Sequence, residues 1–123
     1  MDSSTTITLG FSPCPNDTMI FYGIAHEYVG TELNWKIHID DIQSLNTLAI
    51  DNTIDVVKVS YNAFGHIASE YVMLAAGGAL GRGVGPLVVS RQPLSSLEGK
   101  TVAIPGSPTT ANLLLRLSQP DTI

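Results

Sequence analysis

Polar side chains gather in the stretch GFSPCPNDT, from Gly10 to Thr18. The apolar run ITLGF enters it and the amphipathic run TMIFYGIAHEY leaves it, a pattern typical of a strand that turns directly into a helix. Backbone N–H groups at the start of such a helix attract anions and carboxylates. Ser12 and Asn16 add polar side chains at the same place. We therefore expect this turn to form one wall of a small-molecule site.

Two more polar turns, KVSYN and IPGSPTT, follow predicted strands. Ligands of open parallel sheets bind beyond the carboxyl ends of the strands, so we expect all three turns to meet at one crevice. Their hydroxyl groups suit a substrate that carries a carboxylate and several hydroxyls, although such residues are most often helix caps. The hydroxyl residues are Ser12, Ser60, Ser107, Thr109 and Thr110.

Lys58 is a charged residue inside the apolar run IDVVKVS. A charged group in such a strand needs a partner or a path to solvent. Lys58 is therefore either a ligand contact or the ion-pair partner of Asp17 or Asp55.

Other residues with reactive side chains are sparse. Cys14 is the only cysteine, which excludes an intrachain disulfide and leaves thiolate zinc binding unsupported. We interpret it as inert, because no histidine is positioned beside it. The run GGALGRGVGP lacks the Lys-Ser/Thr ending of a phosphate loop and is interpreted as a packing turn, with Arg82 free to face the crevice. No metal site is predicted, and the histidines fall on predicted surfaces: His26, His38 and His66.

Composition narrows the class of protein. The chain has 123 residues, of which 44% are hydrophobic and only 14% charged, as expected of one well-filled domain. Its net charge of −5 and its six scattered basic residues argue against a nucleic-acid partner. No apolar run approaches the roughly 18 residues that span a bilayer. The first residues also lack a secretory signal, so we expect a cytoplasmic protein, although a signal removed beforehand would leave the same sequence.

Strand and helix patterns alternate along the chain, which predicts an α/β protein with a mainly parallel sheet and helices on both faces. We expect the first three strands in the order 2-1-3, with later strands beyond the third. A polar boundary near residues 91–99 divides a first lobe, 1–92, from a crossover and the start of a truncated second lobe, 93–123. Asn16 or Asp17 is expected to cap the first helix and Thr109 the last. The predicted strands are 7–11, 33–39, 54–59, 71–76, 86–90 and 101–104, and the helices are 17–28, 42–50, 61–71 and the segment after Thr109.

The motifs SPCPNDT, DVVKVS, ALGRGVGPLVVS and GKTVAIPGSPTTANLLL occur in this order. Together they resemble the 1,4-dihydroxy-6-naphthoate synthases, from about residue 7 to residue 117. This family acts in menaquinone biosynthesis by the futalosine route. The resemblance implies a type II periplasmic-binding-protein-like fold, in which two α/β lobes hold the substrate between them. It also implies a lyase without metal or organic cofactor, which converts cyclic dehypoxanthine futalosine to 1,4-dihydroxy-6-naphthoate and dihydroxyacetone.

The resemblance places substrate contacts on Lys58, Val59 and Ser60 and on Thr109 and Thr110. Members of the family are more than twice as long, and their general-base histidine lies in the second lobe. No catalytic residue is therefore assigned, and the chain alone is expected to be inactive.

The alternative function is a module of the same fold that binds a small carboxylate without chemistry. A third possibility is an inert, partly folded product. An unpaired sheet edge makes a homodimer or a companion fragment a further expectation.

Overall fold

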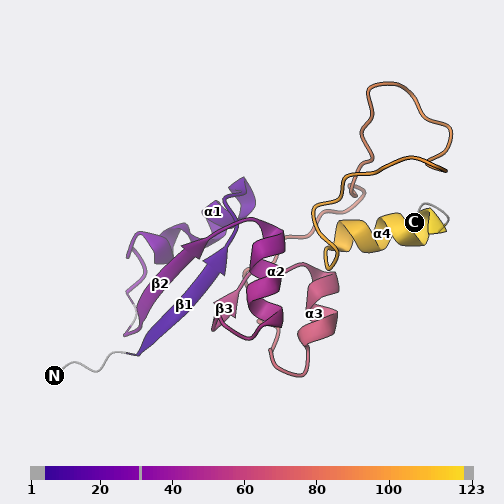
Figure 1. Cartoon of the computed structure of the whole chain (residues 1–123). Coiled ribbons are helices and arrows are strands. Elements are labelled where there is room, and N and C mark those ends of the chain that lie inside the picture. The colour runs from indigo at the N-terminus through magenta and orange to yellow at the C-terminus, as the bar shows by residue number, and fades with distance from the viewer. Residues whose placement is uncertain (1–4, 31, 121–123) are drawn as a thin grey trace.

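The computed structural model describes residues 5–30 and 32–120 and forms one small sheet with helices around it (Figure 1). Strand β1 is followed by helix α1 and strand β2, and strand β3 lies between helices α2 and α3. Helix α4 comes after a long segment without helix or strand. The elements are β1 (Thr6–Phe11), α1 (Pro15–Ala25), β2 (Asn34–Ile39), α2 (Ile42–Ile50), β3 (Val56–Val57), α3 (Tyr61–Ile67) and α4 (Thr110–Ser118).

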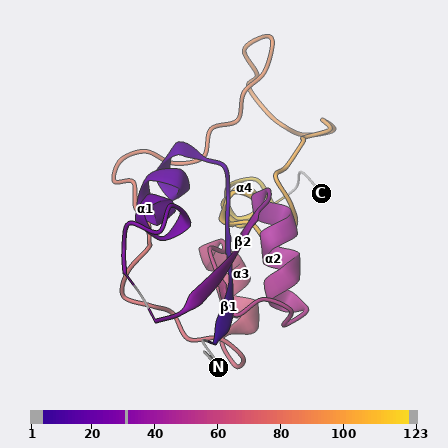
Figure 2. The same cartoon turned by 90° about the vertical axis from the view of Figure 1, so that its left-hand side faces the viewer.

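The sheet is parallel and has the predicted order, with β1 between β2 and β3. Leu9 of β1 pairs with Ile37 on one side and Val56 on the other. Helices α1 and α2 cover opposite faces of this sheet, α3 packs on α2, and α4 contacts α3 (Figure 2). The α/β class, the parallel pairing and the cover on both faces are therefore confirmed. The core residues come from β1, α2 and α3, with one from the α2–β3 connection and one from the later segment: Leu9, Phe11, Leu45, Ala49, Ile54, Ala63, Ile67 and Leu97.

Two glycines permit close packing. A Cβ at Gly10 would lie 2.6 Å from Ile54 Cδ1 and 3.0 Å from Leu45 Cδ2, so the bare backbone of β1 lets both side chains pack against it. Gly106, just before α4, has φ 140°, a conformation that L side chains rarely adopt. A Cβ there would also meet the Gln43 side chain of α2. These positions fix how closely α2 approaches β1 and the start of α4.

The first helix begins earlier than predicted. Its N-cap is Cys14, which makes no side-chain cap bond, and Pro15 occupies the first helical turn, where its missing N–H costs nothing. Neither Asn16 nor Asp17 is the cap, because Asp17 is buried and its carboxylate turns back to Ser12. The caps of α2 and α4 are side-chain caps: Asp41 accepts from two backbone N–H groups, and Thr109 accepts from Asn112 N as predicted.

Three helices and strands are shorter than predicted. Helix α1 ends at Ala25, and Glu27 follows with φ 58° while Tyr28 N donates to Gly23 O, which closes the helix end. Helix α3 ends at Ile67, whose carbonyl oxygen accepts from the N–H groups of Glu70 and Tyr71. Strand β3 contains only Val56–Val57. Just before it, a backbone group hydrogen-bonds to a side chain instead of to a strand, because the carbonyl oxygen of Ile54 accepts from Tyr71 Oη.

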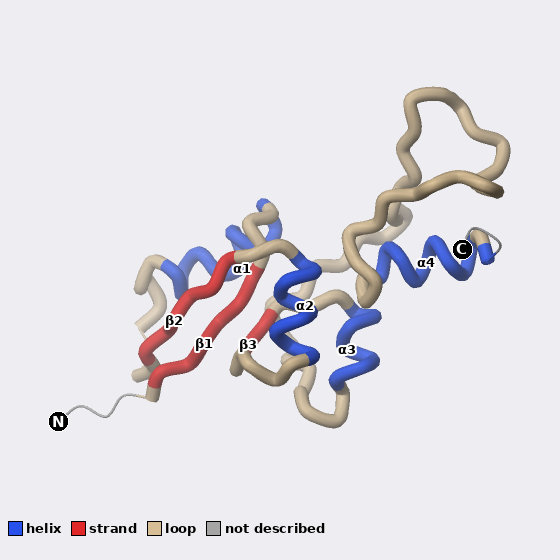
Figure 3. Tube along the Cα trace, in the orientation of Figure 1, coloured by secondary structure: helices blue, strands red, loops and turns tan. Residues whose placement is uncertain are grey.

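The predicted strands at 71–76, 86–90 and 101–104 are absent from the structure, so no strand lies beyond β3 among the described residues. Residues 68–109 run as an extended loop away from the sheet and back to α4 (Figure 3). Their β-branched and apolar residues favour strands, but a strand also needs a neighbouring backbone with which to pair. Within residues 5–30 and 32–120 this loop pairs with no strand, and many of its apolar side chains stay exposed, for example Val72, Leu87 and Val89 at 87%, 85% and 86%.

No helix in the described ranges 5–30 and 32–120 is long and apolar enough to cross a membrane.

Candidate functional site

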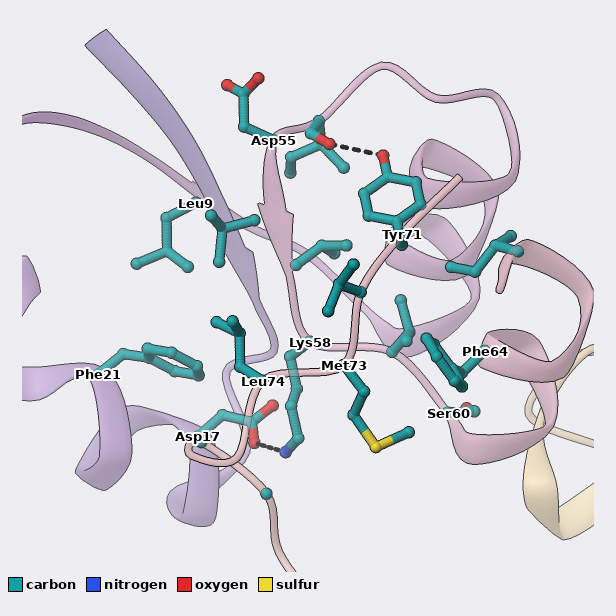
Figure 4. Close-up of a pocket in the computed structure, with 18 of the residues that line it drawn as sticks. Leu9, Asp17, Phe21, Asp55, Lys58, Ser60, Phe64, Tyr71, Met73 and Leu74 are labelled. Carbon is teal, nitrogen blue, oxygen red and sulfur yellow. Dashed lines mark hydrogen bonds and ion pairs between the residues drawn. The ribbon is translucent and has the colours of Figure 1, made fainter. Parts of the chain in front are cut away.

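A pocket of about 1130 Å³ lies between the carboxyl ends of β1 and β3 and the chain that follows α3 (Figure 4). Its wall includes the β3–α3 turn, the first turn of α1, and Thr110 of α4. All three turns singled out in the sequence therefore contribute lining residues, the first of them through Asp17. Much of the remaining wall is apolar, with Phe21, Phe64, Met73 and Leu74 drawn in the close-up.

Lys58 forms an ion pair with Asp17, with 2.6 Å between Lys58 Nζ and Asp17 Oδ1. The other carboxylate oxygen of Asp17 accepts from Ser12 Oγ at 2.8 Å and from Ser12 N at 3.2 Å. Asp55, the other candidate partner of Lys58, instead accepts from the hydroxyl and backbone N–H of Thr8. Of the two pairings left open by the sequence, the structure contains the one with Asp17.

The electrostatics of Asp17 follow from these contacts. Burial raises the pKa of its carboxyl group, but hydrogen bonds from Lys58 and Ser12 outweigh burial and hold the pKa below its ordinary value. Asp17 is therefore ionised at neutral pH. The ammonium of Lys58, which lines the same pocket, provides the opposite charge.

Ser60, directly after β3, is held by Asn46 of α2. Asn46 Nδ2 donates to Ser60 Oγ at 3.2 Å, and Ser60 N donates to Asn46 Oδ1 at 3.0 Å. Asn46 is fully buried, so this reciprocal pair is shielded from water. Because the Ser60 oxygen accepts from Asn46, its own proton can be donated to an acceptor in the pocket.

The two threonines at the start of α4 have different surroundings. Thr109 is 3% exposed, and its hydroxyl donates to Gly106 O at 2.7 Å and accepts from Asn112 N at 3.3 Å. Its side chain is thus used as a helix cap. Thr110 lines the pocket, and its hydroxyl oxygen accepts from Asn62 N at 3.2 Å. Its proton, like that of Ser60, can be donated to a ligand.

The structure separates the predicted site residues into two groups. Lys58, Val59, Ser60 and Thr110 line the pocket together. The other predicted residues are not among its lining residues: Ser12 lies buried behind Asp17, Thr109 is buried as a cap, and Asn16 is exposed on α1. Cys14, Arg82 and the three histidines are also absent from the lining.

Sequence reasoning did not single out Asn46 and Asn62, and it considered Asp17 as a helix cap or a partner for Lys58 rather than as a lining residue. Asn46 had a recognisable signal, because it falls on the apolar face of the predicted helix between Ile42 and Ala49. A polar side chain at such a position must find a buried partner. Asn62, which donates through Nδ2 to Thr109 O at 3.4 Å, had no comparable signal.

The site can bind and orient a ligand through hydroxyl and ammonium donors set against an apolar wall. Among residues 5–30 and 32–120 there is no group of three or more His, Cys, Asp or Glu side chains that could hold a metal ion. In that same part of the chain no histidine lines the pocket.

Comparison with known proteins gives consistent matches. A family model described as menaquinone biosynthesis matches residues 7–123. A curated protein of Thermus thermophilus named 1,4-dihydroxy-6-naphthoate synthase is 50% identical over 111 residues, which cover 90% of this chain and 41% of that protein. A protein of the same name from Streptomyces coelicolor is 41% identical over 121 residues, which cover 98% of this chain and 43% of the relative.

A crystal structure of a protein from Archaeoglobus fulgidus superposes with a TM-score of 0.90 at 38% identity, covering 97% of this chain and 45% of that one. The chain thus spans less than half the length of each relative that it matches.

Proposed function

The chain belongs to the menaquinone biosynthesis family, and from this premise we propose that it is part of a 1,4-dihydroxy-6-naphthoate synthase. Such a synthase is a lyase that converts cyclic dehypoxanthine futalosine into 1,4-dihydroxy-6-naphthoate and dihydroxyacetone. The observation that carries the proposal is the pocket in which Lys58, Ser60 and Thr110 meet, in a chain whose relatives have this name. Two segments far apart in the sequence, the turn after β3 and the start of α4, supply donors to that one pocket.

The proposed role of this chain is to bind and orient the substrate. Ser60 and Thr110 present hydroxyl protons, because their oxygens already accept from Asn46 and Asn62. The side chains of Phe21 and Phe64 offer apolar surface for an aromatic ring. The chemical step requires a base that comes within hydrogen-bond reach of the substrate proton, and the proposal assigns that base to the second lobe of the full-length enzyme.

We further propose that the fold is of the type II periplasmic-binding-protein kind, with residues 1–92 in the first lobe and 93–123 at the start of the second. Helix α4 supports this division, because it lies apart from the sheet and packs against helix α3 of the proposed first lobe (Figure 1). Thr110 then belongs to the opposite wall of the substrate crevice. The substrate would be held where α4 begins, between the two lobes.

The test is calorimetric titration of the chain with cyclic dehypoxanthine futalosine. Binding is expected, and Ser60→Ala and Thr110→Val should each weaken it by about fivefold, because a lost hydrogen bond costs about 1 kcal/mol. Ser69→Ala, outside the pocket lining, is the matched control and should bind as tightly as the unaltered chain.

Absence of binding would overturn the proposed function, and turnover by the chain alone would overturn the placement of the base. The alternative, a module that binds small carboxylates without chemistry, is favoured by the lack of a histidine among the described pocket residues. Binding of benzoate but not of cyclic dehypoxanthine futalosine would support it.

A further inference from the structure

Asp17 is the one charged residue among the buried positions in the described part of the chain, with 4% of its surface exposed. Three donors reach its carboxylate: Ser12 N, Ser12 Oγ and Lys58 Nζ. The first two come from the turn after β1 and the third from the end of β3. Asp17 therefore ties two of the site-forming turns together through a single side chain.

The contact also decides where the Lys58 ammonium lies. In the close-up, Lys58 and Asp17 meet beside Met73 and Leu74, on a mostly apolar part of the pocket wall (Figure 4). An unpaired ammonium is costly beside apolar groups, so the counter-charge of Asp17 permits Lys58 to stay there. An ammonium has three protons, and one is donated to Asp17. The remaining protons can be donated to a ligand in the pocket.

The charge balance of the pair restricts which ligand atom suits this position. A ligand carboxylate at Lys58 would place two anions around one ammonium, with Asp17 held 2.6 Å from Nζ. A neutral carbonyl or hydroxyl oxygen accepts from the same ammonium without that repulsion. Ser60 and Thr110, which have no acid partner, offer neutral donors elsewhere in the pocket.

We propose that Asp17 is a positioning residue, which holds the Lys58 ammonium at the pocket wall and, by neutralising it, reserves this position for an uncharged oxygen of the substrate. The proposal rests on the proposed function for the identity of the substrate. The preference for an uncharged oxygen at Lys58 is thus assigned to Asp17, which does not itself need to touch the ligand. The preference arises because the two side chains neutralise each other.

The first test observes Lys58 directly by NMR in chain labelled with nitrogen-15 lysine. The chain has only two other lysines, Lys36 and Lys100, both exposed, so the Lys58 ammonium should give a distinct signal with slow proton exchange. Asp17→Asn should abolish this signal, and Asp51→Asn, an equal change of charge outside the pocket lining, should leave it unchanged. A Lys58 signal that resembles those of Lys36 and Lys100, or one that survives Asp17→Asn, would overturn the proposal.

The second test uses sodium benzoate as an anion probe in a chloride-free buffer. Removal of the Asp17 charge leaves an unbalanced ammonium, so Asp17→Asn should bind benzoate about tenfold more tightly than the unaltered chain. Adding Lys58→Met to Asp17→Asn should abolish the gain, and Asp51→Asn should show none. A general loss of structure cannot produce tighter anion binding, whereas unchanged or weaker benzoate binding by Asp17→Asn would overturn the charge-balance role.

These readouts separate this proposal from the proposed function. Failure of cyclic dehypoxanthine futalosine to bind, with an intact Lys58 signal and the benzoate gain, would overturn only the identity of the substrate. If Asp17→Asn does not fold, Ser12→Ala provides the same test, because it removes one of the three donors that fix the carboxylate. Proton exchange at the Lys58 ammonium should then quicken at least about twofold, and unchanged exchange would contradict the proposal.

Discussion

Lys58 shows how far single residues can be interpreted from sequence. Its charge inside an apolar run predicts a buried partner, and the structure supplies one. The choice between Asp17 and Asp55 could not be made from sequence, because it depends on the register of β3 against β1. That register pairs Leu9 with Val56 and leaves Asp55 beside Thr8. The sequence around Lys58 is enough to predict that it needs a partner, whereas the choice of partner depends on the strand register of the sheet.

The Asp17 carboxylate should make stability depend on acidity in a defined direction. Burial raises its pKa, but the bonds from Lys58 and Ser12 more than offset this, so the folded pKa is below the unfolded value of about 3.9. The stabilisation is then fully present above about pH 4 and is lost as pH falls through the lower folded pKa. We expect the difference in unfolding free energy between the unaltered chain and Asp17→Asn to shrink from pH 7 to pH 3.

Urea unfolding at the two pH values measures this difference. Asp41 and Asp55 also have lowered pKa values, through hydrogen bonds from Ser44 and Thr8 respectively. Their protonation in acid should lower the unfolding free energy of the unaltered chain and of Asp17→Asn by the same amount. Comparison with Asp17→Asn removes that common background. A difference that is constant or grows in acid would contradict the ionised Asp17–Lys58 pair.

At the scale of elements, the sequence predicted well where local and tertiary preferences agree. Helix α2 has the predicted bounds, Ile42–Ile50, because Asp41 caps it and its apolar face meets β1. The three predicted strands after α3 are absent, although their residues have strand propensity, because a strand forms only beside a partner backbone. The same holds for the pocket. The sequence pattern predicted that the ends of β1 and β3 and the start of α4 would form its walls, but it did not predict the contribution of residues 71–79.

Packing of β1 against its neighbours predicts opposite effects of alanine at two glycines. At Gly10 the new Cβ would lie 2.6 Å from Ile54 Cδ1, so Gly10→Ala should destabilise the chain by about 1–3 kcal/mol. At Gly65, in α3, nothing lies within 4 Å of the new Cβ. Gly65→Ala should therefore stabilise it by about 0.5–1 kcal/mol, because alanine favours helices more than glycine does. Denaturant unfolding compares the two, and equal effects would refute the close packing at Gly10.

The segment 72–94 contributes many of the exposed large apolar side chains of the molecule. Its large apolar side chains are exposed, Leu80 at 76% and Leu94 at 47% among them. A concentration of exposed apolar side chains along one segment is expected where another part of the protein or a partner covers it. In the relatives, which are more than twice as long, there is additional chain available for this purpose.

On its own, the chain should therefore self-associate. Analytical ultracentrifugation is expected to show dimers or larger species whose fraction rises with concentration. Leu87→Glu combined with Val89→Glu should reduce association without lowering the unfolding free energy, since both side chains are more than four-fifths exposed, at 85% and 86%. Leu97→Glu is the contrasting variant, because Leu97 is only 8% exposed and its replacement should destabilise the fold. A stable monomer at high concentration would contradict the prediction.

The loop of residues 68–109 has one more consequence, for proteolytic nicking. Arg82, Arg91 and Lys100 are exposed in it and lie in no helix or strand, so trypsin should cut the loop before it cuts the sheet. Two hydrogen bonds from Asn62 would then help to hold the fragment carrying α4 to α3: its backbone N–H donates to Thr110 Oγ1, and its Nδ2 donates to Thr109 O. Brief digestion should release short loop peptides and leave an N-terminal and a C-terminal piece that separate in urea. Asn62→Ala removes the Nδ2 bond but keeps the backbone bond, so the pieces should separate at a lower urea concentration than in the unaltered chain. The nicked chain would then allow one wall of the pocket to be exchanged for another.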